Sequence, residues 1–156
     1  MQFSIIGQWL IDGKSPNTGQ PVLETCRIVK PEHFDWKCGD EKIFFVPPYR
    51  RGYYDSPRVV YAVGKTYAIQ SGRGQKAIGR TPPLASIRRQ DVRTMTLDDA
   101  VRRGFASVEN NLLFWTQMHD PTANAICWRD ESFACLRHRP ADRYDAWVLT
   151  FEGGAS

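Results

Sequence analysis

The sequence predicts a mixed α+β fold, mainly β with two or three short helices, arranged as a small closed or partly closed barrel. Three observations support this prediction. Many short segments with strand-like alternation are separated by turns rich in Pro, Gly and Asn. Two helix starts, at Thr96 and Ser107, come late in the chain. Residues 144–152 then alternate as a last strand, and closing the strands into a barrel removes unpaired edges.

The expected elements follow from the local patterns. A helical turn is expected over residues 8–12 and ends at Gly13. A helix is expected from Thr96 to about Arg103, where Gly104 ends it. A further helix is expected from Ser107 and ends at Asp120-Pro121. Residues 33–41 and 121–143 read as loops. Strands are expected at residues 3–7, 22–29, 42–46, 59–63, 65–70, 77–80, 84–91 and 144–152.

Length and hydropathy limit the number of domains and indicate whether the chain contains a membrane span. The 156 residues fit one domain, expected over residues 1–152 with a frayed tail at 153–156. No apolar run approaches the roughly 20 residues that span a bilayer. The first residues lack the basic and apolar regions of a signal peptide. We therefore expect a cytoplasmic protein that does not bind membranes.

Basic charge is concentrated in the middle of the chain. Residues 42–93 carry eleven Lys or Arg and two acids, a net of +9, whereas the segments before and after are net acidic. A field of one sign attracts polyanions and releases their counterions. The alternative is a solvated basic face that only aids solubility. Aromatic residues and Gly are interleaved with the Lys and Arg residues of this segment, and this pattern favours nucleic acid as the partner.

A Gly-rich basic turn is the strongest local candidate for phosphate contact. Gly72 and Gly74 allow the backbone to approach a ligand, and Arg73 and Lys76 flank them as phosphate partners. Tyr67 is expected to stack on a base. The alternative is an ordinary turn with solvated side chains. Neighbouring candidates for nucleic-acid contact are Lys65, Gln70 and Arg80.

A second candidate segment interleaves charge with aromatic rings. Arg50 and Arg51 precede Tyr53 and Tyr54, the combination that single-stranded nucleic acid needs for neutralised phosphates and stacked bases. An exposed loop without a ligand explains the pattern equally well.

The cysteines do not form a recognised metal motif. Cys127, Cys135 and His138 lie within twelve residues, with His119 upstream, but their spacing matches no common structural zinc site. We expect reduced thiols, no metal and no cofactor.

Several segments are informative through their order along the chain. They include Thr25-Cys26-Arg27-Ile28-Val29-Lys30-Pro31, the stretch from Val63 to Ala77, the helix at Thr96–Gly104 and the last strand. Together they resemble the ASCH domain, a family of PUA-like β-barrels, and most of all its small members from bacteria and their phages. The resemblance implies a PUA-like barrel that binds RNA or single-stranded DNA in a basic cleft, with Arg27 among the contacts. One feature departs from the family: a Pro/Asn/Gly-rich insertion splits the compact Gly-x-Lys-x-x-x-x-Arg signature between Lys14 and Arg27.

The resemblance also implies an enzymatic alternative. Some ASCH proteins hydrolyse an acylated cytidine with a Lys, a Thr and a Glu, and the nearest matches here are Lys14, Thr25 and Glu24. A desolvated amine or an activated hydroxyl attacks an amide while a carboxylate moves the proton. A third alternative is a protein partner, for which residues 121–143 would provide an inserted docking segment.

Overall fold

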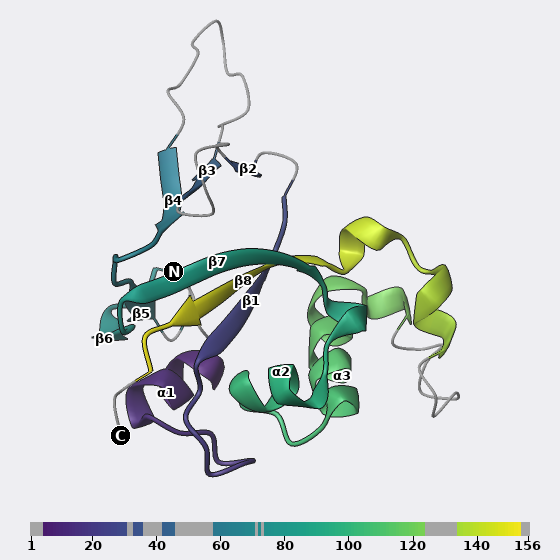
Figure 1. Ribbon diagram of the computed structural model, residues 1–156, viewed down its shortest axis with the longest axis horizontal. Helices are drawn as coiled ribbons and strands as arrows, with labels where there is room; N and C mark the ends of the chain where they lie inside the picture. The colour runs from purple at the N-terminus through teal and green to yellow at the C-terminus, as the bar shows by residue number, and fades with distance from the viewer. Residues whose placement is uncertain are drawn as a thin grey trace, which may run out of the picture.

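The computed structural model describes residues 5–30, 33–35, 42–45, 58–70, 72, 74–123 and 134–153. Its helices and strands are mixed along the chain, which makes the fold α+β (Figure 1). The α-helices are α1 (Ile5–Asp12), α2 (Leu97–Arg102) and α3 (Val108–His119), and short 3-10 turns are η1 (Val92–Thr94), η2 (Ala134–His138) and η3 (Ala141–Arg143). The strands are β1 (Glu24–Ile28), β2 (His33–Asp35), β3 (Lys42–Phe45), β4 (Arg58–Ala62), β5 (Ala68–Gln70), β6 (Ala77–Arg80), β7 (Leu84–Asp91) and β8 (Asp145–Phe151).

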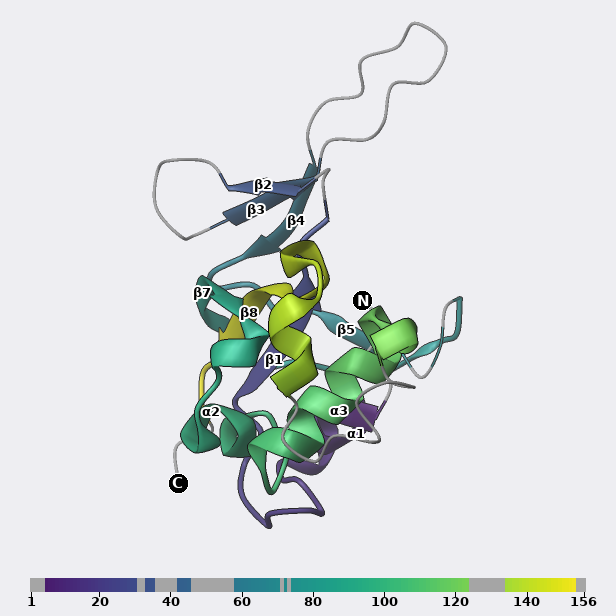
Figure 2. The same ribbon diagram turned by 90° about the vertical axis from the view of Figure 1, so that its right-hand side faces the viewer.

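The described strands form three antiparallel sheets. The order is β1-β8-β7 in the central sheet, β2-β3-β4 in the second, and β5-β6 form a hairpin. Within the described residues these sheets do not close into a barrel. In Figures 1 and 2 the β2–β4 sheet projects from one end of the molecule, away from the three helices.

The last strand, β8, forms where the alternation predicts a strand, and it lies at the centre of its sheet. β8 pairs with β1 on one side and with β7 on the other, from Thr150 opposite Glu24 to Ala146 opposite Ile28. Trp147, Val148 and Leu149 are almost fully buried. Both faces of β8 are covered, so β-branched and aromatic side chains there contribute the burial that holds the sheet.

The N-terminal segment corrects one sequence expectation. A strand was expected at residues 3–7, but α1 runs from Ile5 to Asp12. Ile6, Trp9 and Leu10 have the spacing of one helix face and pack against the core. Gly13, with φ of +77°, provides the left-handed residue after the helix. A short apolar run does not by itself distinguish a strand from the first turn of a helix.

The two late helices begin at the predicted residues. The Thr96 hydroxyl accepts from the Asp99 N–H, and the Asp99 carboxylate accepts from the Thr96 N–H, which completes a capping box at α2. The Ser107 hydroxyl caps α3 through the Asn110 N–H. Gly104 follows α2 with φ of +91° and lies directly against the Trp9 ring.

Two expected loops contain short regular structure. Residues 33–41 were expected to lack a strand, yet β2 pairs with β3 there, His33 lying opposite Phe45. Three residues are too few for an alternation to be recognised in a sequence. Residues 121–143 were also expected to form a loop, but their second half contains the short turns η2 and η3 just before β8. The Arg93 guanidinium anchors η2 by donating to the carbonyl oxygen of Leu136 at 3.0 Å.

Candidate functional site

A cavity of about 440 Å³ runs along β1. Residues Thr25 to Ile28 of that strand all line it. Successive side chains of a strand point to opposite faces of the sheet, so four consecutive residues line one cavity only when it follows the edge of the strand. The volume falls within the range of small-ligand pockets, about 300–1,000 Å³.

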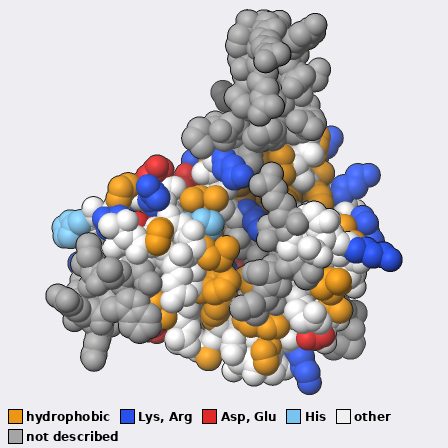
Figure 3. Space-filling model, turned by 180° about the vertical axis from the view of Figure 1, so that it is seen from behind, with side chains coloured by type: hydrophobic (Ala, Val, Ile, Leu, Met, Phe, Trp, Pro, Cys, Tyr) orange, Lys and Arg blue, Asp and Glu red, His pale blue; other side chains and the backbone are white. Residues whose placement is uncertain are grey.

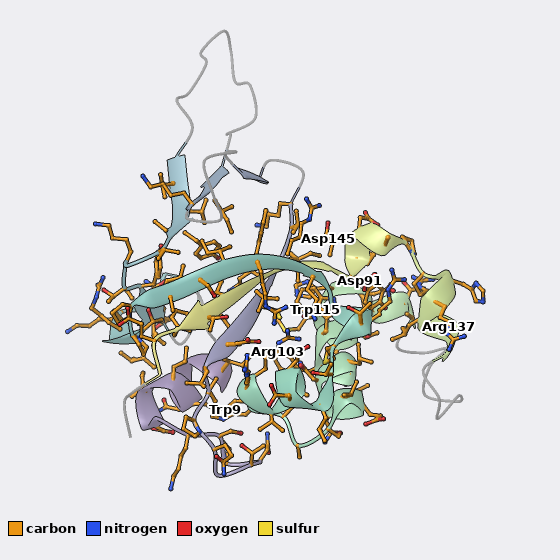
Figure 4. The ribbon with its side chains drawn as sticks, viewed as in Figure 1. Trp9, Asp91, Arg103, Trp115, Arg137 and Asp145 are labelled. Atoms are coloured by element: carbon orange, nitrogen blue, oxygen red, sulfur yellow. The ribbon has the colours of Figure 1, made fainter. Side chains whose placement is uncertain are left out.

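The rest of the lining is largely apolar and aromatic. Phe114, Trp115 and Met118 line the cavity from α3, Ile6 from α1, and Phe105 from the connection between α2 and α3. Figure 4 shows Trp115 beneath the central sheet on the side of α2 and α3. Such rings bury large apolar area and offer flat faces to a planar ligand.

The polar part of the lining carries positive charge. Arg27, Lys30 and Arg103 all line the cavity, together with His119. Among the described residues that line it, none is an Asp or a Glu. Positive groups beside low-dielectric walls focus a field that attracts anions.

Arg103 is held in place by a buried ionic cluster. Its side chain is 1% exposed, and Nη2 donates to Gln90 Oε1 at 2.6 Å. Its Nε lies 3.5 Å from the carboxylate of Glu24, which is also only 1% exposed. Arg88 and Arg102 reach the same carboxylate at 3.4 and 3.3 Å. Three guanidinium groups around one carboxylate compensate its burial. Asp99 pairs with Arg88 and Asp98 with Arg102, so three carboxylates balance the three arginines of the cluster.

Two further polar groups line the cavity without an ionic role. Asn111 of α3 is buried, and its Oδ1 has no hydrogen-bond partner. A buried acceptor without a partner is costly unless a ligand or water satisfies it. The other group is the Cys26 thiol, whose pKa burial raises to about 11. At neutral pH this thiol is protonated and is a poor nucleophile.

A second, more open hollow of about 560 Å³ adjoins the cavity. The two share Ile28, Lys30 and His119, and Arg143 also lines the second hollow. The His119 ring packs against Trp115, with centroids 4.2 Å apart, and burial followed by the nearby charge of Arg27 lowers its pKa. Figure 3 shows Lys and Arg side chains beside a band of hydrophobic side chains on the face opposite to that of Figure 1.

Of the residues expected from the enzymatic alternative, the cavity contains one. Thr25 is buried and lines it. Lys14 is exposed in the turn after α1 and lines neither hollow. The Glu24 carboxylate is occupied by the three arginines. These three groups therefore do not converge around a common substrate position.

The residues expected to bind nucleic acid are divided between two places. Arg27 lines the cavity, whereas Lys65 and Lys76 are exposed beside the β5–β6 hairpin. Arg50, Arg51 and Arg73 lie outside the described residues.

Three side chains near the hairpin have local partners. The Tyr67 hydroxyl accepts from the Ala62 N–H at 2.6 Å, and its ring packs edge-on against Tyr61. Gln70 donates to the Gln75 carbonyl at 2.9 Å. Arg80 donates to Thr66 Oγ1 and to the Thr66 carbonyl, both at 3.1 Å. These contacts give Tyr67, Gln70 and Arg80 structural roles in the hairpin.

Sequence reasoning missed Arg103 and Asn111 as cavity residues. Arg103 was only the expected end of a helix, and Asn111 was an unremarkable polar residue of the next helix. A signal did exist for Asn111: it lies one turn before Trp115, on the stripe of α3 that faces the core. For His119 the sequence indicates no role beyond that of a potential metal ligand.

Within the described residues there is no group of three or more His, Cys, Asp or Glu side chains that could hold a metal ion. Cys127 and Cys135 lie outside the residues whose side chains are described. No described helix is long and apolar enough to cross a bilayer. Comparison with protein-family models, with curated proteins and with solved structures found no match for this chain.

Proposed function

We propose that the protein binds single-stranded nucleic acid and places one unpaired base in the cavity beside β1. The observation that carries the proposal is the composition of the lining: aromatic walls, three basic side chains and no described carboxylate. A nucleotide presents the complementary features, a planar apolar ring with a hydrogen-bonding edge and a negatively charged phosphate.

The adjoining hollow supports a strand rather than a free nucleotide. It continues from the mouth of the cavity at Ile28 and Lys30 toward Arg143. The hollow is lined by Lys30, Arg89 and Arg143 and also by Asp142 and Asp145, and Arg89 is paired with Asp145. A strand with one base in the cavity would therefore have Lys30 and Arg143 as its phosphate partners there. Taking a base out of its stack costs least when the nucleic acid is already single-stranded, so RNA or single-stranded DNA is the expected ligand.

The proposal includes a PUA-like relationship of the ASCH type, which rests on the resemblance of the sequence segments. It does not include amide hydrolysis, because Thr25 is the single member of the Lys14, Thr25 and Glu24 set that lines the cavity. The exposed side chains of Lys65 and Lys76 remain candidates for additional phosphate contacts.

A salt titration tests the proposal. Binding of a fluorescent short oligonucleotide, RNA or DNA, is measured by anisotropy at increasing salt for the wild type and Lys30→Ala. We expect log K to fall linearly with log salt, and the variant to reduce the slope by about 0.7 if Lys30 meets one phosphate. Lys14→Ala, which removes an equal charge outside both hollows, should keep the slope of the wild type. Absence of binding by the wild type at low salt would contradict the proposal.

The hairpin is tested separately. If Lys76 meets a further phosphate, Lys76→Ala lowers the slope by a similar amount, and the reduction adds to that of Lys30→Ala. An unchanged slope in Lys76→Ala would remove the hairpin from the interface while leaving the cavity in it.

A further inference from the structure

The backbone hydrogen bonds of β1 divide its residues into two sets. The Val29 N–H donates to the Asp145 carbonyl at 2.9 Å, and the Phe151 N–H donates to the Leu23 carbonyl at 2.8 Å. Both pairs follow the uninterrupted register between β1 and β8. In an antiparallel ladder the hydrogen-bonded pairs alternate along the strand. Thr25 and Arg27 therefore also direct their backbone groups toward β8.

The residues between them direct their backbone groups the other way. The N–H and C=O of Cys26 and Ile28 point away from β8, toward the edge along which the cavity runs. β8 is the one strand that pairs with β1 in the described part of the chain. The described residues provide these groups with no backbone hydrogen bond. Both residues are half-buried, so these N–H and C=O groups are donors and acceptors available to whatever occupies the cavity.

We propose that β1 reads the inserted base with its main chain: the N–H and C=O of Cys26 bind the Watson–Crick edge of the base, and Asn111 provides a further polar contact. This inference rests on the proposed function. In an extended strand the N–H and C=O of one residue lie on the same side, where they bind a neighbouring acceptor and donor. Each unpaired base carries such an adjacent pair on its Watson–Crick edge, whereas a paired base has already used it.

The occupant to which the geometry points is a base and not a peptide strand. A peptide added to an open edge pairs along the strand and places side chains on both faces of the sheet. The space beside β1 is instead a cavity whose lining includes the aromatic side chains of Phe105, Phe114 and Trp115. It is lined by three basic residues, which favour a nucleotide over an uncharged segment of peptide.

Proline substitution tests the main-chain contact. Cys26→Pro removes the N–H that points into the cavity without removing a hydrogen bond to β8, and proline is accepted at edge positions of this kind. Cys26→Ala is the matched control, because it also lacks the thiol but keeps the N–H. We expect Cys26→Pro to bind the oligonucleotide about ten-fold more weakly than Cys26→Ala, as loss of one buried hydrogen bond predicts. Equal affinities of two folded variants would overturn the inference.

The ligand offers a second test that does not depend on the fold of a variant. The ligands are oligonucleotides in which a single base stands among abasic sites, and the base that gives the tightest binding to wild type is identified first. That base is then methylated either on its Watson–Crick ring nitrogen or on a carbon away from that edge. We expect the first methyl group to lower affinity at least about ten-fold and the second to change it little. Equal losses, or none, would overturn main-chain reading. Failure of every strand, abasic or not, to bind wild type would instead contradict the proposed function itself.

Discussion

The hydroxyl of Tyr144 donates a hydrogen bond of 2.8 Å to the carboxylate of Asp120, and both residues are buried. Arg139 donates to the same carboxylate from Nε and Nη2, at 2.8 and 2.6 Å. Asp120 caps the end of α3, and Tyr144 immediately precedes β8. The network therefore connects α3, which lines the cavity, to β8, the central strand of the sheet.

Tyr144→Phe should destabilise the protein by about 1 to 3 kcal/mol. The substitution keeps the ring but leaves one acceptor position of the buried Asp120 carboxylate without its donor. Chemical denaturation of the variant measures the loss. An unchanged denaturation midpoint and slope would show that water replaces the hydroxyl without cost.

Acid should weaken the same network. The hydrogen bonds from Arg139, and then the one from Tyr144, hold the pKa of Asp120 below its usual value of 3.8. Because the folded-state pKa is lowered, the stabilisation is present above the unfolded pKa and is lost as pH falls through the folded value. Unfolding free energy measured below about pH 4 should fall more steeply in wild type than in Arg139→Gln. Arg137→Gln, which changes an exposed arginine of the adjacent turn η2, should retain the steep fall of the unfolding free energy.

Gly104→Ala should cost about 2 to 4 kcal/mol of stability. A Cβ at this position would lie 2.6 Å from Cε3 of Trp9, and the backbone φ of +91° disfavours any side chain. Gly64→Ala is the matched control, because Gly64 has a similar φ of +83° but no atom within 4 Å of the added Cβ. It should cost about 1 kcal/mol. Thermal unfolding of the two variants separates the clash from the conformational cost, and equal losses would contradict the close approach to Trp9.

Binding should respond to the charge of His119. Burial, followed by Arg27, lowers the pKa of this histidine below 6.5, so the ring is neutral at pH 7. Protonation at lower pH adds a positive charge at the mouth shared by the two hollows. Oligonucleotide affinity should therefore rise as pH falls below about 6.5. His119→Gln should remove this rise, whereas His138→Gln, which changes an exposed histidine outside both hollows, should keep it. A rise of equal size in His119→Gln would assign the effect to another group.

The sequence predicted those features that depend on a few neighbouring residues. The caps at Thr96 and Ser107 and the left-handed Gly104 each depend on a few consecutive residues, and the structure confirms all three. The alternation of residues 144–152 likewise predicted a strand there, and the structure confirms it as β8. The residues before Gly13 were misassigned because a short apolar run does not show its period until it is longer than two helical turns.

The cavity was not predictable in the same way. Its walls combine Ile6 from α1, Thr25 from β1 and Asn111 from α3, which come together only through tertiary packing. The charge pattern pointed to residues 42–93, yet the basic residues that line the cavity, Arg27, Lys30 and Arg103, all lie outside that segment. Net charge along a sequence does not show which side chains share a surface.

Among the described strands, β1 has a partner on one edge only, and its other edge bears on self-association. An unpaired strand edge is a template on which a second copy of the same chain can add a strand, which is a common route to aggregation. Beside β1, side chains of α1 and α3 line the cavity and occupy the space that a second strand would need. The walls that enclose the cavity therefore also protect the strand edge from pairing with a second copy of the chain.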